Sequence, residues 1–277
     1  MHNRQVRISA VNRVAMLVVM VVAAVACVST ASFAQDKPFE PTVGQPGKDV
    51  VWVPTPPALV DRMMELAKVT PQDYVMDLGS GDGRNIIAAA KRGATAVGVE
   101  YNPEMVKLSQ RLAAEAGVGD KARFVEGDMF VADISKASVM ALFLLPSNML
   151  QLRDKFLNLR PGSRIVSNTF GIEGWTPDET STVGGDCSAW CNALLWIVPA
   201  KVDGTWQMPQ GALTLTQDYQ MVSGTLGSMP IANGKLRGET LTFTAGGAEY
   251  TAKVAGNRMD GTMKSGAAST PWTATKN

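Results

Sequence analysis

Histidine is almost missing from this chain of 277 residues. The single histidine, His2, lies at the very start of the sequence. Removal of residues 1–34, which have the pattern of a secretory signal, would leave a chain with no imidazole at all. Histidine-based catalytic triads, histidine-bound metals and a histidine general base are therefore excluded from the mature chain.

Cysteine is also scarce. The sequence has three cysteines, and only Cys187 and Cys191 lie beyond residues 1–34. Two thiolates without further cysteine or histidine make a poor zinc site, so we predict no bound metal. In an oxidising compartment, two cysteines this close in sequence are expected to form a local disulfide.

An excess of basic residues is lacking as well. Removing residues 1–34 subtracts three of the 26 basic residues and none of the 25 acidic ones, which leaves a formal net charge of about −2. Nucleic-acid binding depends on neutralising phosphates with lysine and arginine. The sequence shows neither a basic excess nor a basic stripe, which argues against DNA or RNA as a partner.

The N-terminal residues have the pattern of a secretory signal. Three arginines precede an uncharged apolar run from Val14 to Val28, and small residues follow at Ser32 and Ala34. This pattern predicts cleavage after Ala34 and export to the periplasm or cell envelope. An uncleaved membrane anchor is the alternative, because the run up to Phe33 is about long enough to span a bilayer.

The part of the chain after this signal alternates between strand and helix patterns up to about Val198. Residues 35–48 are rich in proline, glycine and polar residues and are predicted to form a linker. Prolines keep residues 51–57 extended, and a helix is expected from Pro57. Further strands are predicted over 74–78, 95–100, 123–126, 139–145 and 164–167, and helices over 85–91, 103–116 and 148–159. This alternation predicts an α/β domain with a parallel sheet over residues 49–199.

Beyond Val198 the helical periodicity stops. Short strands punctuated by glycine are predicted over 213–216, 221–226, 240–244, 250–254 and 259–263. Asn233-Gly234 and Gly246-Gly247 are typical hairpin turns. We therefore expect a separate β-rich C-terminal domain over residues 200–277, folded as a small antiparallel sheet or barrel.

A glycine-rich bend follows the first predicted strand of the α/β domain. It runs Asp77-Leu-Gly-Ser-Gly-Asp-Gly-Arg84, with glycine at every second position. Glycine suits a bend with unusual backbone angles, at which a ligand approaches the main chain. A dinucleotide-binding fingerprint would have a small residue at the place of Arg84, so a nicotinamide oxidoreductase is a weak alternative.

Two more acidic residues lie where neighbouring strands of such a sheet end. Glu100 closes the second predicted strand after Asp77, and Asp128 follows the third. A carboxylate at the position of Glu100 can reach two ribose hydroxyls. A charge that ends an apolar strand needs a compensating interaction, and ligand binding supplies one.

The glycine bend and its acids resemble motif I and the following motifs of class I methyltransferases. The resemblance implies a doubly wound, Rossmann-like, mostly parallel sheet of seven strands with S-adenosyl-L-methionine as the cofactor. Asp77 and the bend would hold the methionine part, Glu100 the ribose, and Asp128 the adenine amino group, with the neighbouring residue on the ring. The implied cofactor-binding residues are Asp77, Gly79, Ser80, Gly81, Gly83, Glu100, Tyr101, Asp128 and Met129.

A closer resemblance covers about residues 50–200. It is carried by Val53-Pro-Thr-Pro56, the bend at 77–84, Asn102-Pro103, the segments 142–147 (Leu-Phe-Leu-Leu-Pro-Ser) and 159–167 (Leu-Arg-Pro-Gly-Ser-Arg-Ile-Val-Ser). These segments are similar to the lysine methyltransferases that modify the ATP synthase c-subunit and the ADP/ATP carrier. The resemblance implies a protein lysine amine as the methyl acceptor and places Pro54–Pro56 near the mouth of the active site.

Several residues are weaker candidates for contact with the acceptor. Ser147 and Asn148 follow the fourth strand, although capping of the next helix is the role that we expect for them. Asp82 and Glu104 are candidate bases, and Asp82 is expected to act mainly as a residue of the bend.

Tryptophans are a further candidate wall for an acceptor channel. Trp175, Trp190 and Trp196 fall in or near the last predicted hairpin of the sheet. For each of them we expect ordinary core or interface packing.

Two other functions are compatible with the sequence. A small-molecule methyltransferase would share the same cofactor motifs. A non-catalytic S-adenosylmethionine-binding module of the cell envelope is the second alternative, because export separates the domain from cytosolic S-adenosylmethionine.

Overall fold

The computed structural model describes residues 39–185 and 187–276. The predicted signal or anchor, at residues 1–34, lies outside this range and stays a prediction. Within the described range, no helix combines the length and apolar character needed to cross a membrane.

The first sheet has seven strands in the order β3-β2-β1-β4-β5-β7-β6. Pairing is parallel from β3 to β5 and antiparallel at β7 and β6. The strands are β1 (Tyr74–Leu78), β2 (Thr95–Glu100), β3 (Ala122–Glu126), β4 (Val139–Leu142), β5 (Arg164–Asn168), β6 (Glu179–Thr182) and β7 (Asn192–Ile197). This order and direction confirm the predicted doubly wound α/β class.

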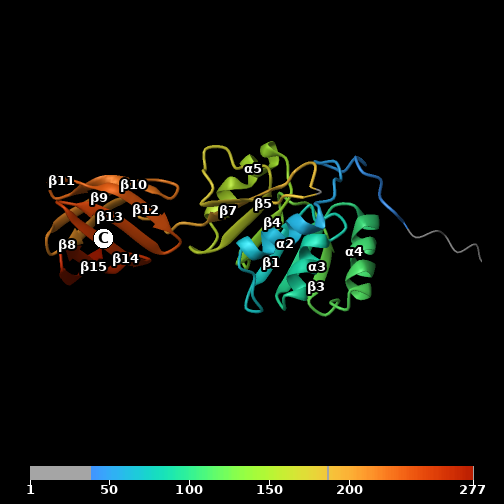
Figure 1. The fold of residues 1–277 in the computed structure, drawn as a ribbon, viewed down its shortest axis with the longest axis horizontal. Coiled ribbons are helices and arrows are strands. Elements are labelled where there is room, and N and C mark those ends of the chain that lie inside the picture. Colours follow the sequence, from blue (N-terminus) through green and yellow to red (C-terminus); the bar gives the residue numbers. More distant parts are fainter. Residues whose placement is uncertain (1–38, 186, 277) are drawn as a thin grey trace, which may run out of the picture. The chain divides into compact units, whose positions relative to one another are not determined.

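Helices cover both faces of this sheet (Figure 1). They are α2 (Pro57–Leu66), α3 (Arg84–Lys91), α4 (Pro103–Glu115) and α5 (Pro146–Leu157). Buried residues of α2, α3 and α4 share one core with Val75, whereas those of α5 share a second core with Met76. The side chains of Val75 and Met76 thus point to opposite faces of the sheet, as expected for successive residues of a strand.

The second sheet is antiparallel and closes on itself (red and orange in Figure 1). Its strands are β8 (Gly204–Met208), β9 (Gly211–Asp218), β10 (Met221–Leu226), β11 (Met229–Pro230), β12 (Ala232–Arg237), β13 (Thr240–Ala245), β14 (Ala248–Ala255), β15 (Arg258–Ser265) and β16 (Ala268–Thr275). Pairing between β9 and β10 joins the two ends. This closed sheet has its own core, which includes Trp206, Phe243, Tyr250 and Trp272.

The structure differs from the sequence-based predictions in several places. Strand β4 ends at Leu142 instead of residue 145, and α5 begins two residues earlier than predicted, with Pro146 in its first turn. Asn233-Gly234, predicted as a hairpin turn, lies inside β12 at an irregular register. Strands β6, β8, β11, β12 and β16 were not predicted, because their apolar alternation is weak or interrupted, and β7 was predicted only as part of a last hairpin without a range.

Candidate functional site

Three acidic residues converge at the carboxyl ends of three adjacent strands. Asp77 lies in β1, Glu100 ends β2 and Asp128 follows β3, and these strands are neighbours in the sheet. All three line one pocket, together with Gly79, Ser80, Gly81, Tyr101 and Met129. In a parallel sheet the carboxyl ends of adjacent strands form the usual binding crevice. The structure thus brings together eight of the nine predicted cofactor-binding residues.

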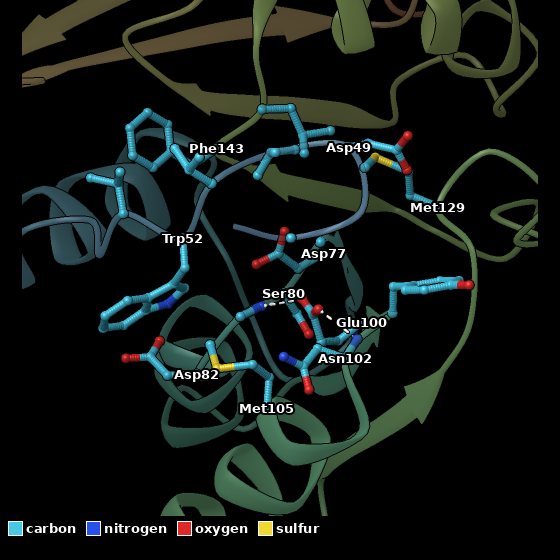
Figure 2. Close-up of a pocket in the computed structure, with 18 of the residues that line it drawn as sticks. Asp49, Trp52, Asp77, Ser80, Asp82, Glu100, Asn102, Met105, Met129 and Phe143 are labelled. Carbon is cyan, nitrogen blue, oxygen red and sulfur yellow. Dashed lines mark hydrogen bonds between the residues drawn. The ribbon is translucent and has the colours of Figure 1, made fainter. Parts of the chain in front are cut away.

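Glu100 ties the glycine bend to the second strand. Its carboxylate accepts hydrogen bonds from Gly81 N at 2.9 Å and from Asn102 N at 3.0 Å (dashed in Figure 2). Asn102 in turn caps α4 by accepting from the backbone N–H of Glu104. Each carboxylate oxygen keeps a second lone pair available for a ligand.

Gly81 is required by its backbone and by a neighbour. Its φ is +56°, and an added Cβ would lie 2.9 Å from the ring of Trp52. Trp52 and Asp82 border one side of the pocket and Met129 the opposite side, with Asp77 and Glu100 between them (Figure 2). Because residue 81 has no side chain, the backbone of the bend remains open to the pocket at this position.

Gly83 lies outside the pocket lining, in contrast to its predicted role. It is the N-cap residue of α3, with φ of +79°, and an added Cβ would lie 2.5 Å from the ring of Phe124 and 2.8 Å from Ser109 Cβ. Its missing side chain lets α3, α4 and β3 pack together. Glycine at 83 is therefore explained by packing beneath the bend.

Asp77 is a buried carboxylate with few partners. Its side chain accepts from Asn85 Nδ2 at 3.0 Å. Burial raises the pKa of Asp77 well above the usual range, the charges of Glu100 and Asp82 add to this effect, and the Asn85 hydrogen bond opposes it. A cation bound beside Asp77 would favour the ionised carboxylate.

Asp128 is paired with a lysine from the N-terminal segment. Lys48 Nζ lies 2.5 Å from Asp128 Oδ2 and 5.0 Å from the centre of the Tyr101 ring. The hydrogen bond from Lys48 and one from the backbone of Phe130 lower the pKa of Asp128. Lys48 thus contacts two of the predicted cofactor-binding residues.

The pocket residues fit S-adenosylmethionine. In the part of the chain that the structure describes, Asp77 Oδ1, Ser80 Oγ and Asn85 Oδ1 are buried without a hydrogen-bond partner, and all three residues line the pocket. Buried polar atoms are normally satisfied, so these atoms are suited to a polar ligand. Across residues 39–185 and 187–276, no cluster of three or more metal-binding side chains occurs.

The candidate catalytic residues from the sequence are not gathered at the pocket. Ser147, Asn148 and Glu104 do not line it, and Asp82 does. The expected capping role of Ser147 and Asn148 is wrong, since the N-cap residue of α5 is Leu145 and no side chain caps the helix. Asp82 is held by Arg84 through Nε and Nη2, as suits a residue of the bend.

Sequence reasoning missed the contribution of the segment before α2. Residues 45–48, predicted as linker, line the pocket together with residues 49–55. Of the segment predicted to lie near the active-site mouth, Pro54 and Thr55 line the pocket and Pro56 does not. In this segment only Trp52 indicated packing against the rest of the domain, because a large apolar side chain in a proline-rich stretch is expected to be partly buried.

An aromatic group lines the other end of the pocket. Phe143, Phe170 and Trp190 belong to the lining, whereas Trp175 and Trp196 are buried in the core, as expected. Cys187 and Cys191, on either side of Trp190, form the disulfide that the sequence predicted. Phe143 and Phe170 were missed because they follow the ends of β4 and β5, where sequence periodicity stops.

The fold and the pocket define a methyltransferase that uses S-adenosylmethionine. The ANTKMT methyltransferase domain matches residues 77–179. The chain is 45% identical over 137 residues to a protein-lysine N-methyltransferase from Saccharolobus islandicus, and the match covers 48% of this chain and 85% of that protein. The protein therefore belongs to the family of the ANTKMT methyltransferase domain.

Two further comparisons agree with this assignment. A Mus musculus lysine N-methyltransferase that acts on the ATP synthase c-subunit is 42% identical over 113 residues, which is 40% of this chain and 46% of that protein. A crystal structure of an RNA methyltransferase from Salinibacter ruber with S-adenosyl-L-homocysteine is 45% identical, with a TM-score of 0.50. The match covers 54% of this chain and 96% of the Salinibacter chain.

Proposed function

We propose that this methyltransferase transfers the methyl group to lysine side-chain amines of a protein. The observation that carries the proposal is the charge of the pocket. Its lining holds five carboxylates (Asp49, Asp77, Asp82, Glu100 and Asp128) and two basic residues (Lys48 and Arg84). An acidic pocket attracts a cationic cofactor and a cationic amine alike. The named activity of the Saccharolobus relative supports the same acceptor.

The chain's own contribution to the reaction is placement and exclusion of water. Bound S-adenosylmethionine supplies an electrophilic methyl group on a sulfonium. Asp77, the bend and Glu100 would hold the cofactor at the carboxyl ends of the strands, and the aromatic residues would border the approach of the acceptor. Alignment of two reactants accounts for much of the barrier reduction in such a transfer.

The acceptor amine must lose its proton before it can attack. A lysine in water has a pKa near 10.4. The apolar side of the pocket, with Phe143, Leu144 and Phe170, lowers the amine pKa by removing water from the charged form. The proton leaves through a water chain or an acidic side chain at the pocket mouth.

We also propose that the enzyme works outside the cytoplasm, in the periplasm or cell envelope. The signal pattern of residues 1–34 supports export. The disulfide between Cys187 and Cys191 supports an oxidising compartment. Export can be tested by fractionating cells and determining the N-terminus of the recovered protein, which should begin after Ala34.

The acceptor is tested by incubating the enzyme with methyl-labelled S-adenosylmethionine and an envelope extract. Label recovered as methyl-lysine after protein hydrolysis supports the proposal. Label only in small solutes would point to a small-molecule acceptor, and label in RNA would follow the activity named for the Salinibacter protein. The variant Asp77→Asn serves as the inactive control. If the wild-type protein binds S-adenosylmethionine but transfers no label to any component of the extract, it is a non-catalytic binding module.

A further inference from the structure

Three aromatic side chains lie at the sheet edge where the pocket opens. Phe143 follows β4, Phe170 follows β5 and Trp190 precedes β7. Strands β5 and β7 pair antiparallel with Asn168 opposite Ala193, so the end of one lies beside the start of the other. The Phe143 ring lies 5.9 Å from that of Phe170 and 6.1 Å from that of Trp190. We call these three residues the aromatic wall.

Trp190 is displayed by a closed loop. The disulfide from Cys187 to Cys191 closes the chain on both sides of it. Its φ is +53°, a conformation that bulky residues seldom adopt. Its side chain is 43% exposed and still borders the pocket, whereas Trp175 and Trp196 are 2% and 0% exposed. Trp190 is therefore placed to meet a ligand, and a core role is ruled out by its exposure.

We propose that the disulfide-closed loop is the outer wall of the acceptor channel, with Trp190 and Phe143 packing along the four-carbon stem of the acceptor lysine. This inference rests on the proposed lysine acceptor. The stem of lysine is apolar and pairs with aromatic faces, while its amine continues towards the acidic end of the pocket. The candidate cofactor residues lie at the ends of β1, β2 and β3, and the wall lies at β4, β5 and β7, so we expect the wall to act on acceptor binding and to leave cofactor binding unchanged.

The disulfide restricts the conformation of the loop that carries Trp190. The small ring that it closes has far fewer conformations than an open loop, so less entropy is lost when the acceptor binds. Opening the ring leaves Trp190 in the chain and removes its fixed position. Reduction of the disulfide and removal of the indole should therefore change the same kinetic constant.

The test compares methyl transfer from labelled S-adenosylmethionine to poly-L-lysine. Trp190→Ala should raise the KM for poly-L-lysine at least about fivefold with little change in kcat, because it removes a modest apolar contact with the acceptor. Trp190→Phe should recover most of the difference. Met221→Ala, which removes an exposed apolar side chain of the closed sheet, should match the wild type. Affinity for S-adenosylhomocysteine, measured by calorimetry, should be equal in all four proteins.

The disulfide is tested with the double variant Cys187→Ser/Cys191→Ser. Its KM should rise in the same direction as that of Trp190→Ala, and a reducing agent should raise the KM of the wild type but not of the double variant. An unchanged KM in both Trp190→Ala and the double variant would overturn the inference while the lysine acceptor stood.

Binding of n-butylamine, an analogue of the lysine stem, separates the two proposals. Saturation-transfer NMR in the presence of S-adenosylhomocysteine should show contact with the wild type and loss of contact in Trp190→Ala. If the wild type methylates no lysine but binds n-butylamine through Trp190, the lysine acceptor is refuted, and the wall is retained only as the contact surface for an alkyl chain of another acceptor. If n-butylamine binds both proteins equally, or neither, the wall is refuted.

Discussion

Asp77 carries a structural cost and lines the candidate cofactor pocket. Its carboxylate is buried, and its pKa is raised because burial and two neighbouring acids disfavour the charge. Ionised Asp77 therefore destabilises the ligand-free fold as the pH rises above the ordinary aspartate range. The cationic cofactor offsets this cost once it is bound.

The variant Asp77→Asn should show both effects. At neutral pH the ligand-free variant should melt at a higher temperature than the wild type, because an amide of the same shape carries no buried charge. Its affinity for S-adenosylmethionine should fall at least about tenfold. Differential scanning calorimetry and titration calorimetry measure the two quantities. A lower melting temperature together with unchanged affinity would show that Asp77 is only a core residue.

The affinity for S-adenosylmethionine should depend on pH through the same group. The bound cation lowers the pKa of Asp77 relative to the ligand-free protein, so binding is strongest above the raised pKa and weakens as the pH falls through it. Titration calorimetry at a series of pH values above the ordinary aspartate range measures this slope. The slope should be absent in Asp77→Asn, and a slope that persists there would assign the titration to another group.

At the residue scale, eight of the nine cofactor-binding residues predicted from the sequence line the pocket, but of its aromatic residues only Tyr101 and Trp190 were named as candidates. Glu100 was predictable because an acid that ends an apolar strand is unusual, Asp77 because it precedes the glycine bend, and Asp128 from the resemblance to methyltransferase motifs. Lys48 and Trp52 were not predictable, because their positions in the pocket depend on the tertiary folding of an irregular segment. Gly83 was assigned to the ligand because the motif alone does not show which glycines face the pocket and which face the core.

Among the elements, α3 and α4 depend on the space that Gly83 leaves. Gly83→Ala places a Cβ against Phe124 and Ser109, whereas Gly117→Ala adds a Cβ at a similar positive φ where nothing lies within 4 Å. We therefore expect Gly83→Ala to lose about 1–3 kcal/mol more unfolding free energy than Gly117→Ala. Urea unfolding of both variants measures the difference. Equal losses would mean that backbone conformation alone explains the glycine at 83.

The elements also show where sequence patterns stop being informative. Strands β1 and β2 were predicted to the residue, because each is a short apolar run between a turn and a glycine or acid. Strand β16 was missed, since its outward residues and Pro271 hide the alternation of Trp272 and Ala274. The Asn233-Gly234 pair was likewise predicted as a hairpin turn, but it lies inside β12, where the register with β13 is irregular.

At the scale of the whole molecule, the closed sheet has a hydrophobic core distinct from those of the α/β sheet. In it Phe243 stacks on Tyr250 at 4.6 Å and meets Trp272 edge-on. Phe243→Ala should cost about 3–5 kcal/mol of unfolding free energy. The affinity for S-adenosylhomocysteine should not change at temperatures where the variant is folded. A parallel loss of affinity would show that the closed sheet supports the cofactor pocket.

The cofactor pocket itself is tested most directly by titration calorimetry with S-adenosylhomocysteine. The wild type should bind, Glu100→Gln should bind at least about tenfold more weakly, and Glu104→Gln, an exposed acid on α4 outside the pocket, should bind like the wild type. Absence of binding by the wild type, or equal binding by all three proteins, would contradict the assignment of this sheet edge as the S-adenosylmethionine site.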